Sequence, residues 1–329
     1  MAAVGEAGGL GFLSGGYATG EALAVRIGAV RRLSERPFGV NLFVPATANR
    51  YAVGPGLVGA ARVDAVAAYR DAVSADARTV CVEPGEPRPG DTHDWQAKLD
   101  LVVRERVPVV SFTFGLPSRQ VLAALRRRGV ECVVTVSSAQ EAAAALEAGA
   151  DGLCVQGDQG GGHRGTLDPS VRPDATDLAD IVAQVTALVA GHDREVSVVA
   201  AGGIATRGCA DVVRAAGADA VQVGTALLLT PEAGTGLAYR RALADSSAPG
   251  TTVTRAFSGR LARCLATDFV ARLHDRAPAA YPEVHHVTAP IRQASAGAGR
   301  PDLVALWAGT GFRATRAVPA AEVVAELGR

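Results

Sequence analysis

The chain alternates short apolar runs with longer amphipathic segments, and this alternation constrains the fold more than any other feature of the sequence. Such a pattern is typical of βα units around a parallel sheet. Apolar runs that predict strands begin at Leu10, Phe38, Thr79, Val107, Cys132, Leu153, Val196 and Ala220. The segments between them predict helices over residues 21–33, 63–74, 95–104, 119–128, 139–148, 178–189 and 209–216. We expect an α/β protein of the TIM (β/α)8-barrel type, because glycine clusters follow the late strands and no GxGxxG follows an early one.

The character of the sequence changes after Thr230, which suggests a division into three parts. Residues 1–230 are predicted to form the barrel. Residues 231–301 lack strand-like runs and are predicted to form a small helical cap over the barrel mouth, with helices over 237–244 and 263–274. Residues 302–329 are expected to return and pack on the barrel.

Composition limits the partners and the compartment of the protein. The 33 basic and 33 acidic residues balance without a basic run, so we expect no nucleic-acid partner. No stretch of about 20 apolar residues predicts a membrane span, and the N-terminus lacks the features of a signal peptide, so a cytoplasmic protein is expected. The five cysteines form no CxxC pair, which argues against disulfides and zinc and favours small core hydrophobes.

The sequence DGLCVQGDQGGGHRG, residues 151–165, is the first candidate site. A buried strand ends at Gln156, and the glycines that follow, Gly161 among them, allow a flat ligand to approach the main chain. His163 would stand at the rim of such a site. The alternative is a mobile glycine-rich surface loop with an incidental histidine. Arg164 is either an anion anchor or a solvated side chain.

Two later clusters suggest a phosphate site. AAGGI at residues 200–204 and QVGT at residues 222–225 follow the last two predicted strands. In barrels, the loops after strands seven and eight commonly hold a phosphate with main-chain N–H groups. Gly203 suits such donation, and Thr225 adds a hydroxyl. A cofactor that carries a phosphate is therefore predicted.

Polar residues elsewhere are less decisive. Asn41 interrupts the apolar run FGVNLFV and is either satisfied by the neighbouring backbone or directed at a ligand. In the cap, Tyr281, His285 and His286 of AYPEVHHVTAPIR can line a pocket, but adjacent histidines are also an ordinary surface feature. Because neighbours on a regular helix do not share one metal ion, no metal site is predicted.

Taken together, these motifs resemble the nitronate monooxygenase family, formerly called 2-nitropropane dioxygenases. The resemblance is carried by AGGLGFL, FGVNLFVP, VVSFTFG, VQGDQGGGHRG, AAGGI, QVGTA, TRAFSGR, YPEVHH and LWAGTG, which cover nearly the whole chain. It implies an FMN-dependent barrel that oxidises alkyl nitronates with dioxygen to carbonyl compounds and nitrite. Its partners would be a nitronate or nitroalkane and dioxygen, and a homodimer is compatible with it.

The resemblance also implies roles for individual residues. His163 would be the catalytic base or anion stabiliser, facing the flavin. Arg164 and Tyr281 are expected to contact the substrate because of their positions in the sequence and not because of the resemblance. FMN contacts are implied for Asn41, Gln156, Gly161, Gly203, Gln222, Val223, Gly224 and Thr225.

The sequence departs from the family pattern in three places. Gln159-Gly160 replaces a Glu-Ala pair, and Ala262-Arg263-Cys264 with Thr267 replaces the usual residues after AFSGR. The family's first strand, of the QAPMAG type, has no counterpart before residues 7–13. The resemblance and the three prolines of residues 83–91 also indicate that the run at 79–82 lies outside the barrel, which leaves seven barrel strands, with the Phe38 and Val107 strands as neighbours.

Two rival functions follow from the same residues. One is an FMN- and NAD(P)H-dependent reductase of quinones or enoyl thioesters on the same fold. The other is a truncated paralogue that binds flavin without catalysis, because the first strand has no counterpart.

Overall fold

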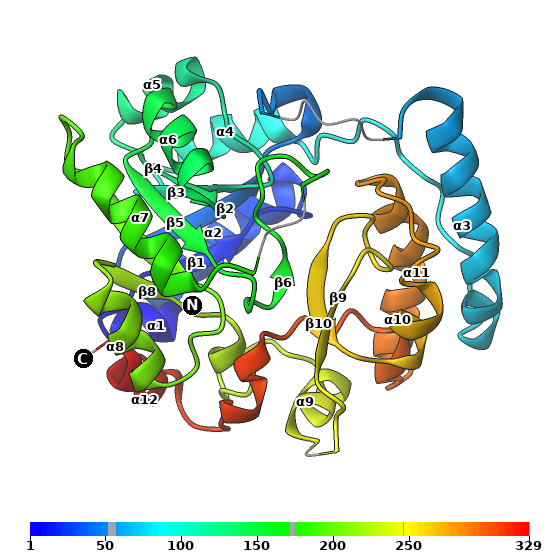
Figure 1. Ribbon diagram of the computed structural model, residues 1–329. Coiled ribbons are helices and arrows are strands. Elements are labelled where there is room, and N and C mark those ends of the chain that lie inside the picture. The colour runs from blue at the N-terminus through cyan, green and yellow to red at the C-terminus, as the bar shows by residue number, and fades with distance from the viewer. Residues whose placement is uncertain (52–56, 172–174, 246, 329) are drawn as a thin grey trace.

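A curled parallel sheet forms the centre of the protein (Figure 1). The computed structural model describes residues 1–51, 57–171, 175–245 and 247–328. The sheet has seven strands in the order β1-β2-β3-β4-β5-β7-β8. They are β1 (Gly11–Ser14), β2 (Phe38–Phe43), β3 (Val109–Thr113), β4 (Glu131–Val136), β5 (Gly152–Gln156), β7 (Ser197–Ala201) and β8 (Ala220–Gln222).

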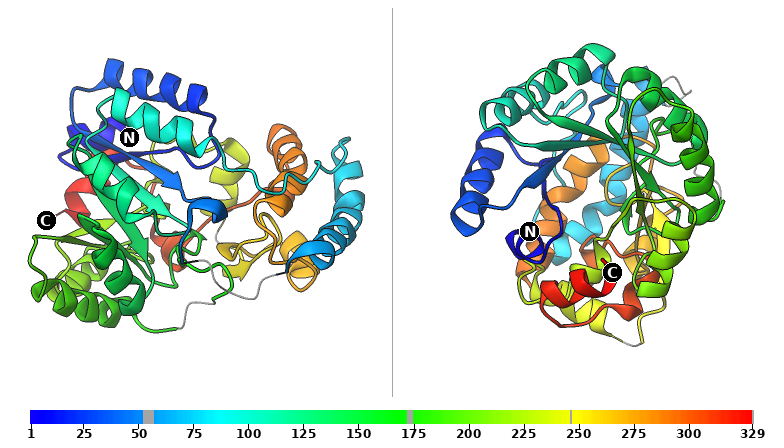
Figure 2. Two further views of the ribbon diagram at one scale, coloured as in Figure 1. Left: turned by 90° about the horizontal axis from the view of Figure 1, so that it is seen from above. Right: turned by 90° about the vertical axis from the view of Figure 1, so that its left-hand side faces the viewer.

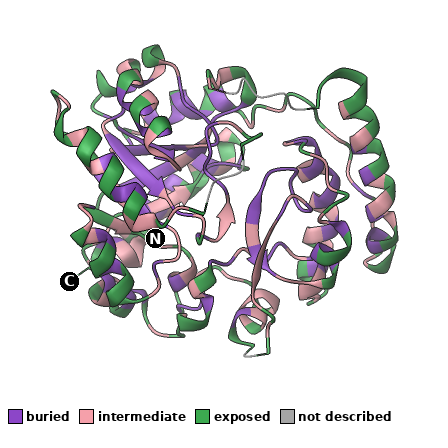
Figure 3. Cartoon of the chain, in the orientation of Figure 1, coloured by how far each residue is buried: buried purple, intermediate pink, exposed green. Residues whose placement is uncertain are grey.

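Helices cover the outer face of this sheet (Figures 1 and 2). They are α2 (Gly20–Leu33), α4 (Trp95–Arg104), α5 (Arg119–Arg126), α6 (Ala139–Ala148), α7 (Leu178–Ala190) and α8 (Arg207–Ala215). Buried residues lie along the inner strands and exposed ones along the outer sides of the helices (Figure 3). The predicted N-cap of the first long helix is confirmed, since Thr19 Oγ1 accepts the Ala22 N–H at 3.1 Å.

The expected strand count is confirmed. Residues 80–82 form no strand, and Thr79 is the last residue of α3 (Gly59–Thr79). β2 pairs directly with β3, with Asn41 opposite Ser111. β1 and β8 stand at the two ends of the strand order, so the described sheet is a half-barrel and not a closed eight-stranded barrel.

A second, smaller unit covers the barrel mouth, and it draws on two distant parts of the chain. Helix α3 packs against α11 (Glu283–Gly297), where Tyr69 and Val284 share one apolar cluster with Phe257 (Figure 1). Tyr69 is fully buried, and its hydroxyl donates to the Ala256 carbonyl at 2.6 Å. The predicted cap of residues 231–301 therefore omitted one of its helices.

The cap is also not purely helical. β9 (Thr251–Thr254) and β10 (Ala262–Leu265) pair antiparallel, and β10 also pairs with β6 (Gly162–His163). The predicted helix over 263–274 is wrong at residues 263–267, because β10 takes residues 263–265 and α10 (Asp268–Leu273) begins only at Asp268. Pairing on both sides of β10 overrides the local helical pattern.

The remaining segments lie around the barrel and the cap. They are α1 (Ala2–Glu6), α9 (Leu237–Ala244), α12 (Ala320–Leu327) and the 3-10 turns Ala46–Ala48, Thr225–Leu227, Pro301–Leu303 and Thr310–Ala314. None of the described helices combines the length and the apolar character needed to cross a bilayer. All five cysteines are free, but Cys81 and Cys209 are exposed, so the prediction that all five are core residues is wrong for these two.

Candidate functional site

A glycine-rich cradle lies at the carboxyl ends of β5, β7 and β8. Its cavity of about 160 Å³ brings together Gln156, Gly161, Gly203 and residues 222–225, all of which the sequence analysis selected. The cradle also includes Gly309 and Gly311, which sequence reasoning did not select. The carboxyl ends of parallel strands share one edge of the sheet, which explains why residues so far apart in the sequence meet.

The glycines of the cradle are required by contacts between loops. A Cβ on Gly161 would lie 2.5 Å from the Gly309 nitrogen, and a Cβ on Gly203 would lie 2.7 Å from the Gln159 side chain. Gly203 also has a φ of +75°, which disfavours other residues. Gly224 differs, because a Cβ there meets nothing within 4 Å and would point into open space.

Arg164 lies inside the loop that precedes it. Its side chain is buried, and its guanidinium donates to the carbonyls of Gly157 at 3.3 Å and Gly162 at 3.2 Å, and also to those of Asp158 and Gly160. Four carbonyls therefore converge on one cation. Arg164 therefore stabilises the glycine loop from within. Its side chain is neither solvated nor directly exposed to a ligand.

His163 follows the cradle loop and is surrounded by aromatic and hydroxyl groups. Its Nε2 lies 2.8 Å from Ser258 Oγ and 3.5 Å from the Tyr17 hydroxyl, and its ring centroid is 4.9 Å from that of Trp307. Burial, and after it the charges of three nearby arginines, lowers the pKa of His163 to about 3. The imidazole is therefore neutral at neutral pH and able to accept a proton.

A larger cavity of about 380 Å³ lies between the barrel and the cap. Phe43 and Phe114 give it apolar walls, and Tyr281 and Arg260 contribute polar groups. The Phe114 ring stands 5.3 Å from the ring of His163, so the cavity begins beside the histidine. Tyr281, selected from the sequence, thus lines this cavity, whereas Arg164 does not.

Arg260, and not Arg164, is the arginine that borders this cavity. It is buried, with its guanidinium 4.3 Å from the centroid of the Phe114 ring, and it donates to the Arg164 carbonyl at 3.2 Å and also to Thr166. Because it faces no carboxylate at these contacts, its positive charge remains available to the cavity. The motif TRAFSGR contained it, but nothing in that pattern distinguished Arg260 from a surface arginine.

Tyr17 is a second residue that sequence reasoning missed. Its ring stacks on His285 with centroids 3.9 Å apart, and its hydroxyl faces His163. The loop that carries it is held by the buried Lys98, whose Nζ donates to the Gly15 carbonyl at 2.5 Å. The signal that was available is its position in the loop that follows the first strand, at the functional edge of the sheet.

Asn41 is placed on β2 and does not line the cradle. Its amide donates to Ser111 Oγ and to Thr113 Oγ1, both at 2.8 Å, so hydroxyls of the adjacent strand satisfy it. Thr113 Oγ1 lies in turn 3.3 Å from Thr135 Oγ1, which extends a polar row across the strands. The implied contact of Asn41 with a flavin stays a prediction.

Known proteins resemble the chain along its whole length. A family model described as nitronate monooxygenase matches residues 1–329. A nitronate monooxygenase of Paraburkholderia phytofirmans is 36% identical over 334 residues, with 100% of this chain and 87% of that protein covered. A probable nitronate monooxygenase of Staphylococcus aureus is 30% identical over 332 residues, with 99% and 88% covered.

Solved structures agree with these relatives. A nitroalkane oxidase from Streptomyces ansochromogenes has a TM-score of 0.89 and 43% identity, covering 99% of this chain and 89% of that one. FabK from Thermotoga maritima has a TM-score of 0.71 at 23% identity, covering 99% and 86%, and shows the shared fold.

The carbonyl contacts of Arg164 predict that lysine cannot replace it. A single ammonium group keeps the charge but cannot reach carbonyls spread along residues 157–162 as a planar guanidinium does. We expect Arg164→Lys to lower the free energy of unfolding by about 2 kcal/mol, since hydrogen bonds to a charged group contribute about 1.5 to 3 kcal/mol each. Hydrogen exchange at residues 157–165 should also accelerate. Unchanged hydrogen exchange in this variant would show that a positive charge alone is sufficient to stabilise the loop.

The lowered pKa of His163 predicts acid-sensitive stability. The unfolded chain has the ordinary value of 6.5, so it binds this proton preferentially as pH falls from 6.5 towards 3, and the free energy of unfolding decreases over that window. His163→Gln cannot be protonated and should lose less stability in urea unfolding between about pH 7 and about pH 4.5. His285, whose pKa burial lowers to about 2, is present in both proteins. Equal losses would contradict the assignment to His163.

Proposed function

This chain belongs to the nitronate monooxygenase family, and from that membership we propose that it uses FMN and dioxygen to convert alkyl nitronates into carbonyl compounds and nitrite. The family and the nitroalkane oxidase neighbour support oxidoreductase activity on nitronates. The observation that carries the finer proposal is the position of a neutral His163, which follows the cradle loop in the chain and whose ring contacts that of Phe114 in the cavity bordered by Arg260. The cradle would bind the cofactor, and the cavity would bind the substrate.

The cradle fits the phosphate end of FMN. It lies at the carboxyl ends of β7 and β8, where barrels commonly bind phosphate. Its volume of about 160 Å³ compares with about 150 Å³ for an engineered cavity that binds benzene, so it accommodates a phosphoryl group and adjoining atoms. Residues 202–203 and 222–225 would hold this end. When bound, FMN supplies the redox chemistry and the reaction with dioxygen.

Positive charge around the cavity suits an anionic substrate. Arg260 borders the cavity, and burial is the main cause that lowers its pKa to about 10, so it remains protonated at neutral pH. Arg292 is held in the same region by the His285 ring, 3.0 Å from its guanidinium. A nitronate carries its negative charge on the nitro oxygens, which this potential would stabilise.

His163 would act as a base and not as a cationic anchor. With neutral imidazole at neutral pH, it would remove the α-proton of a nitroalkane and so produce the nitronate in place. An anion bound beside it would offset the arginine charges and raise the pKa of His163, which strengthens it as a base when substrate is present. Ser258, 2.8 Å from Nε2, orients the ring.

The cofactor assignment predicts a charge-specific effect at Gly224. Gly224→Asp places a carboxylate in the cradle without a steric clash, since a Cβ there meets nothing within 4 Å. We expect this variant to lose yellow colour and FMN binding, while the equally large Gly224→Asn retains binding within about tenfold of the wild type. Fluorescence titration of the apoprotein with FMN measures both. If Gly224→Asp bound FMN as tightly as the wild type, the assignment of the FMN phosphate to this cradle would be wrong.

The catalytic assignment predicts a large effect at His163. The FMN-loaded wild type should consume dioxygen with an alkyl nitronate or nitroalkane, and His163→Ala should retain FMN but lose on the order of 100-fold in nitroalkane turnover. His274→Ala, at a half-buried position in the cap, is the control and should keep full activity. Oxygen-electrode assays measure all three proteins. Unchanged turnover in His163→Ala, or rapid flavin bleaching by NADH without oxygen, would contradict the proposal.

A further inference from the structure

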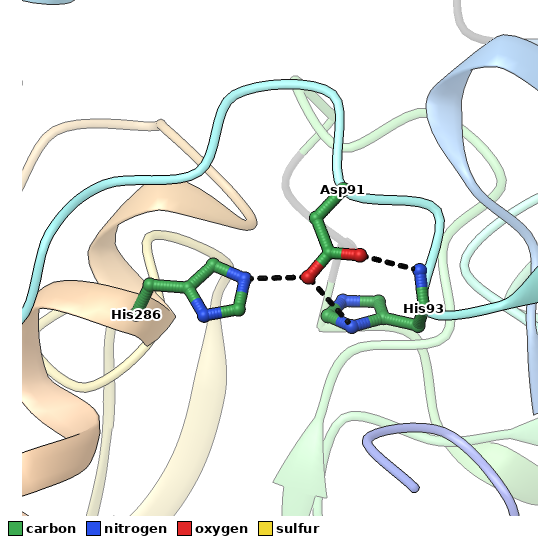
Figure 4. Close-up of side chains that lie close together, drawn as sticks. All are labelled: Asp91, His93 and His286. Carbon is green, nitrogen blue, oxygen red and sulfur yellow. Dashed lines mark hydrogen bonds and ion pairs between the residues drawn. The ribbon is translucent and has the colours of Figure 1, made fainter. Parts of the chain in front are cut away.

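A cluster of two histidines and one aspartate lies at the junction of barrel and cap (Figure 4). Asp91 and His93 belong to the connection between α3 and α4, and His286 lies in the first turn of α11. The cluster is separate from His163 and from the glycine cradle. Sequence reasoning rejected a metal site because His285 and His286 are adjacent on a helix, and it did not foresee that His286 meets partners from a distant loop.

The three ligand atoms are close enough to share one ion. Asp91 Oδ2 lies 2.8 Å from His286 Nε2 and 3.4 Å from His93 Nδ1, and all three atoms lie within 4.8 Å of one another. Ligand atoms in a tetrahedral zinc site are about 3.3 to 3.6 Å apart, given metal–ligand distances of about 2.0 to 2.2 Å. Widening the 2.8 Å pair by about 0.5 Å would bring both Asp91–histidine distances into this range.

Two other polar atoms of the cluster, Asp91 Oδ1 and His93 Nε2, are held by an outer layer of hydrogen bonds. Asp91 Oδ1 accepts the His93 main-chain N–H at 2.7 Å, which leaves Oδ2 for an ion. His93 Nε2 lies 3.0 Å from the Tyr281 hydroxyl, which leaves Nδ1 for an ion. Metal-binding histidines usually present their second ring nitrogen to such a partner, which fixes the ring orientation.

The main chain holds the loop in place independently of these side chains. The Gly85 N–H donates to the Val287 carbonyl at 2.9 Å, so the connection is fastened to α11 next to His286.

Asp91 and His93 also border the cavity of about 380 Å³. A fourth ligand, such as water, therefore has access from the cavity side, as in sites with three protein ligands.

We propose that Asp91, His93 and His286 bind one divalent transition-metal ion, with Zn²⁺ the best match to two imidazoles and one carboxylate. Cations that prefer oxygen ligands, such as Mg²⁺, are disfavoured because two of the three ligand atoms are nitrogen. The ion links the connection between α3 and α4 to helix α11, and so fastens the cap to the barrel. The proposal does not depend on the flavin or on nitronate chemistry.

Calorimetric titration of the chelator-treated full chain with Zn²⁺, and elemental analysis after dialysis, test this proposal. We expect one equivalent in the wild type and at least about tenfold weaker binding in Asp91→Asn and in His286→Gln. Asparagine has the size of Asp91 without its charge, and glutamine replaces the imidazole of His286 with a hydrogen-bonding amide. His274→Gln is the matched control, since this histidine lies in the cap outside the cluster, and it should bind like the wild type.

Thermal unfolding provides a second measurement. Zn²⁺ should raise the melting temperature of the wild type and of His274→Gln but not that of Asp91→Asn, because an ion that binds only the folded state stabilises it. A wild type that takes up no Zn²⁺ would overturn the proposal, as would Asp91→Asn that binds as tightly as the wild type. Either result would identify the cluster as a hydrogen-bond network in which Asp91 accepts from both rings.

Discussion

Close approach of three loops is the constraint on which the candidate site depends. Residues 157–162, 202–203 and 308–311 meet so tightly that a Cβ on Gly202 would lie 2.9 Å from the Gly157 carbonyl oxygen, and one on Gly309 would lie 2.8 Å from that of Gln159. Only glycine permits such distances between main chains. The sequence analysis attributed the glycines of residues 157–162 and 202–203 to a ligand, and the structure shows that they also allow the loops to pack. The cradle is the space that remains once they have done so.

Buried arginines provide the second constraint. Arg164 and Arg260 donate to main-chain carbonyls, so their charge is solvated by the loops but not cancelled by a carboxylate at those contacts. One result is a rigid loop, and the other is a positive potential around His163 that adds to burial, the main cause, in lowering the pKa of its imidazole. The same cations thus shape the loop and contribute to the protonation state of the histidine. A sequence shows the number of arginines but not which of them turn inward.

Local patterns predicted the barrel well and the cap poorly, for physical reasons. The βα alternation places most strands and helices, and α4 and α6 have the predicted bounds, because each repeats one apolar period. The cap depends on contacts between distant segments: Tyr69 of α3 donates to Ala256, and β10 is a strand because it lies between β9 and β6. The cradle residues were found from glycine spacing, whereas nothing in its motif distinguished Arg260, and Tyr17 was marked only by its position in the loop after the first strand.

The edge position of β8 explains why the C-terminal segment contributes to the cradle. β8 has only three residues, none of them buried, unlike the inner strand β5, which is almost wholly buried. A loop that follows such a strand receives little support from the sheet. The support comes instead from residues 302–328: the Gly309 N–H donates to Thr225 Oγ1 at 3.1 Å, and Val323 and Leu327 of α12 pack on Ala226. Changes in this apolar contact should therefore reach the cradle through Thr225, although α12 itself lines no part of it.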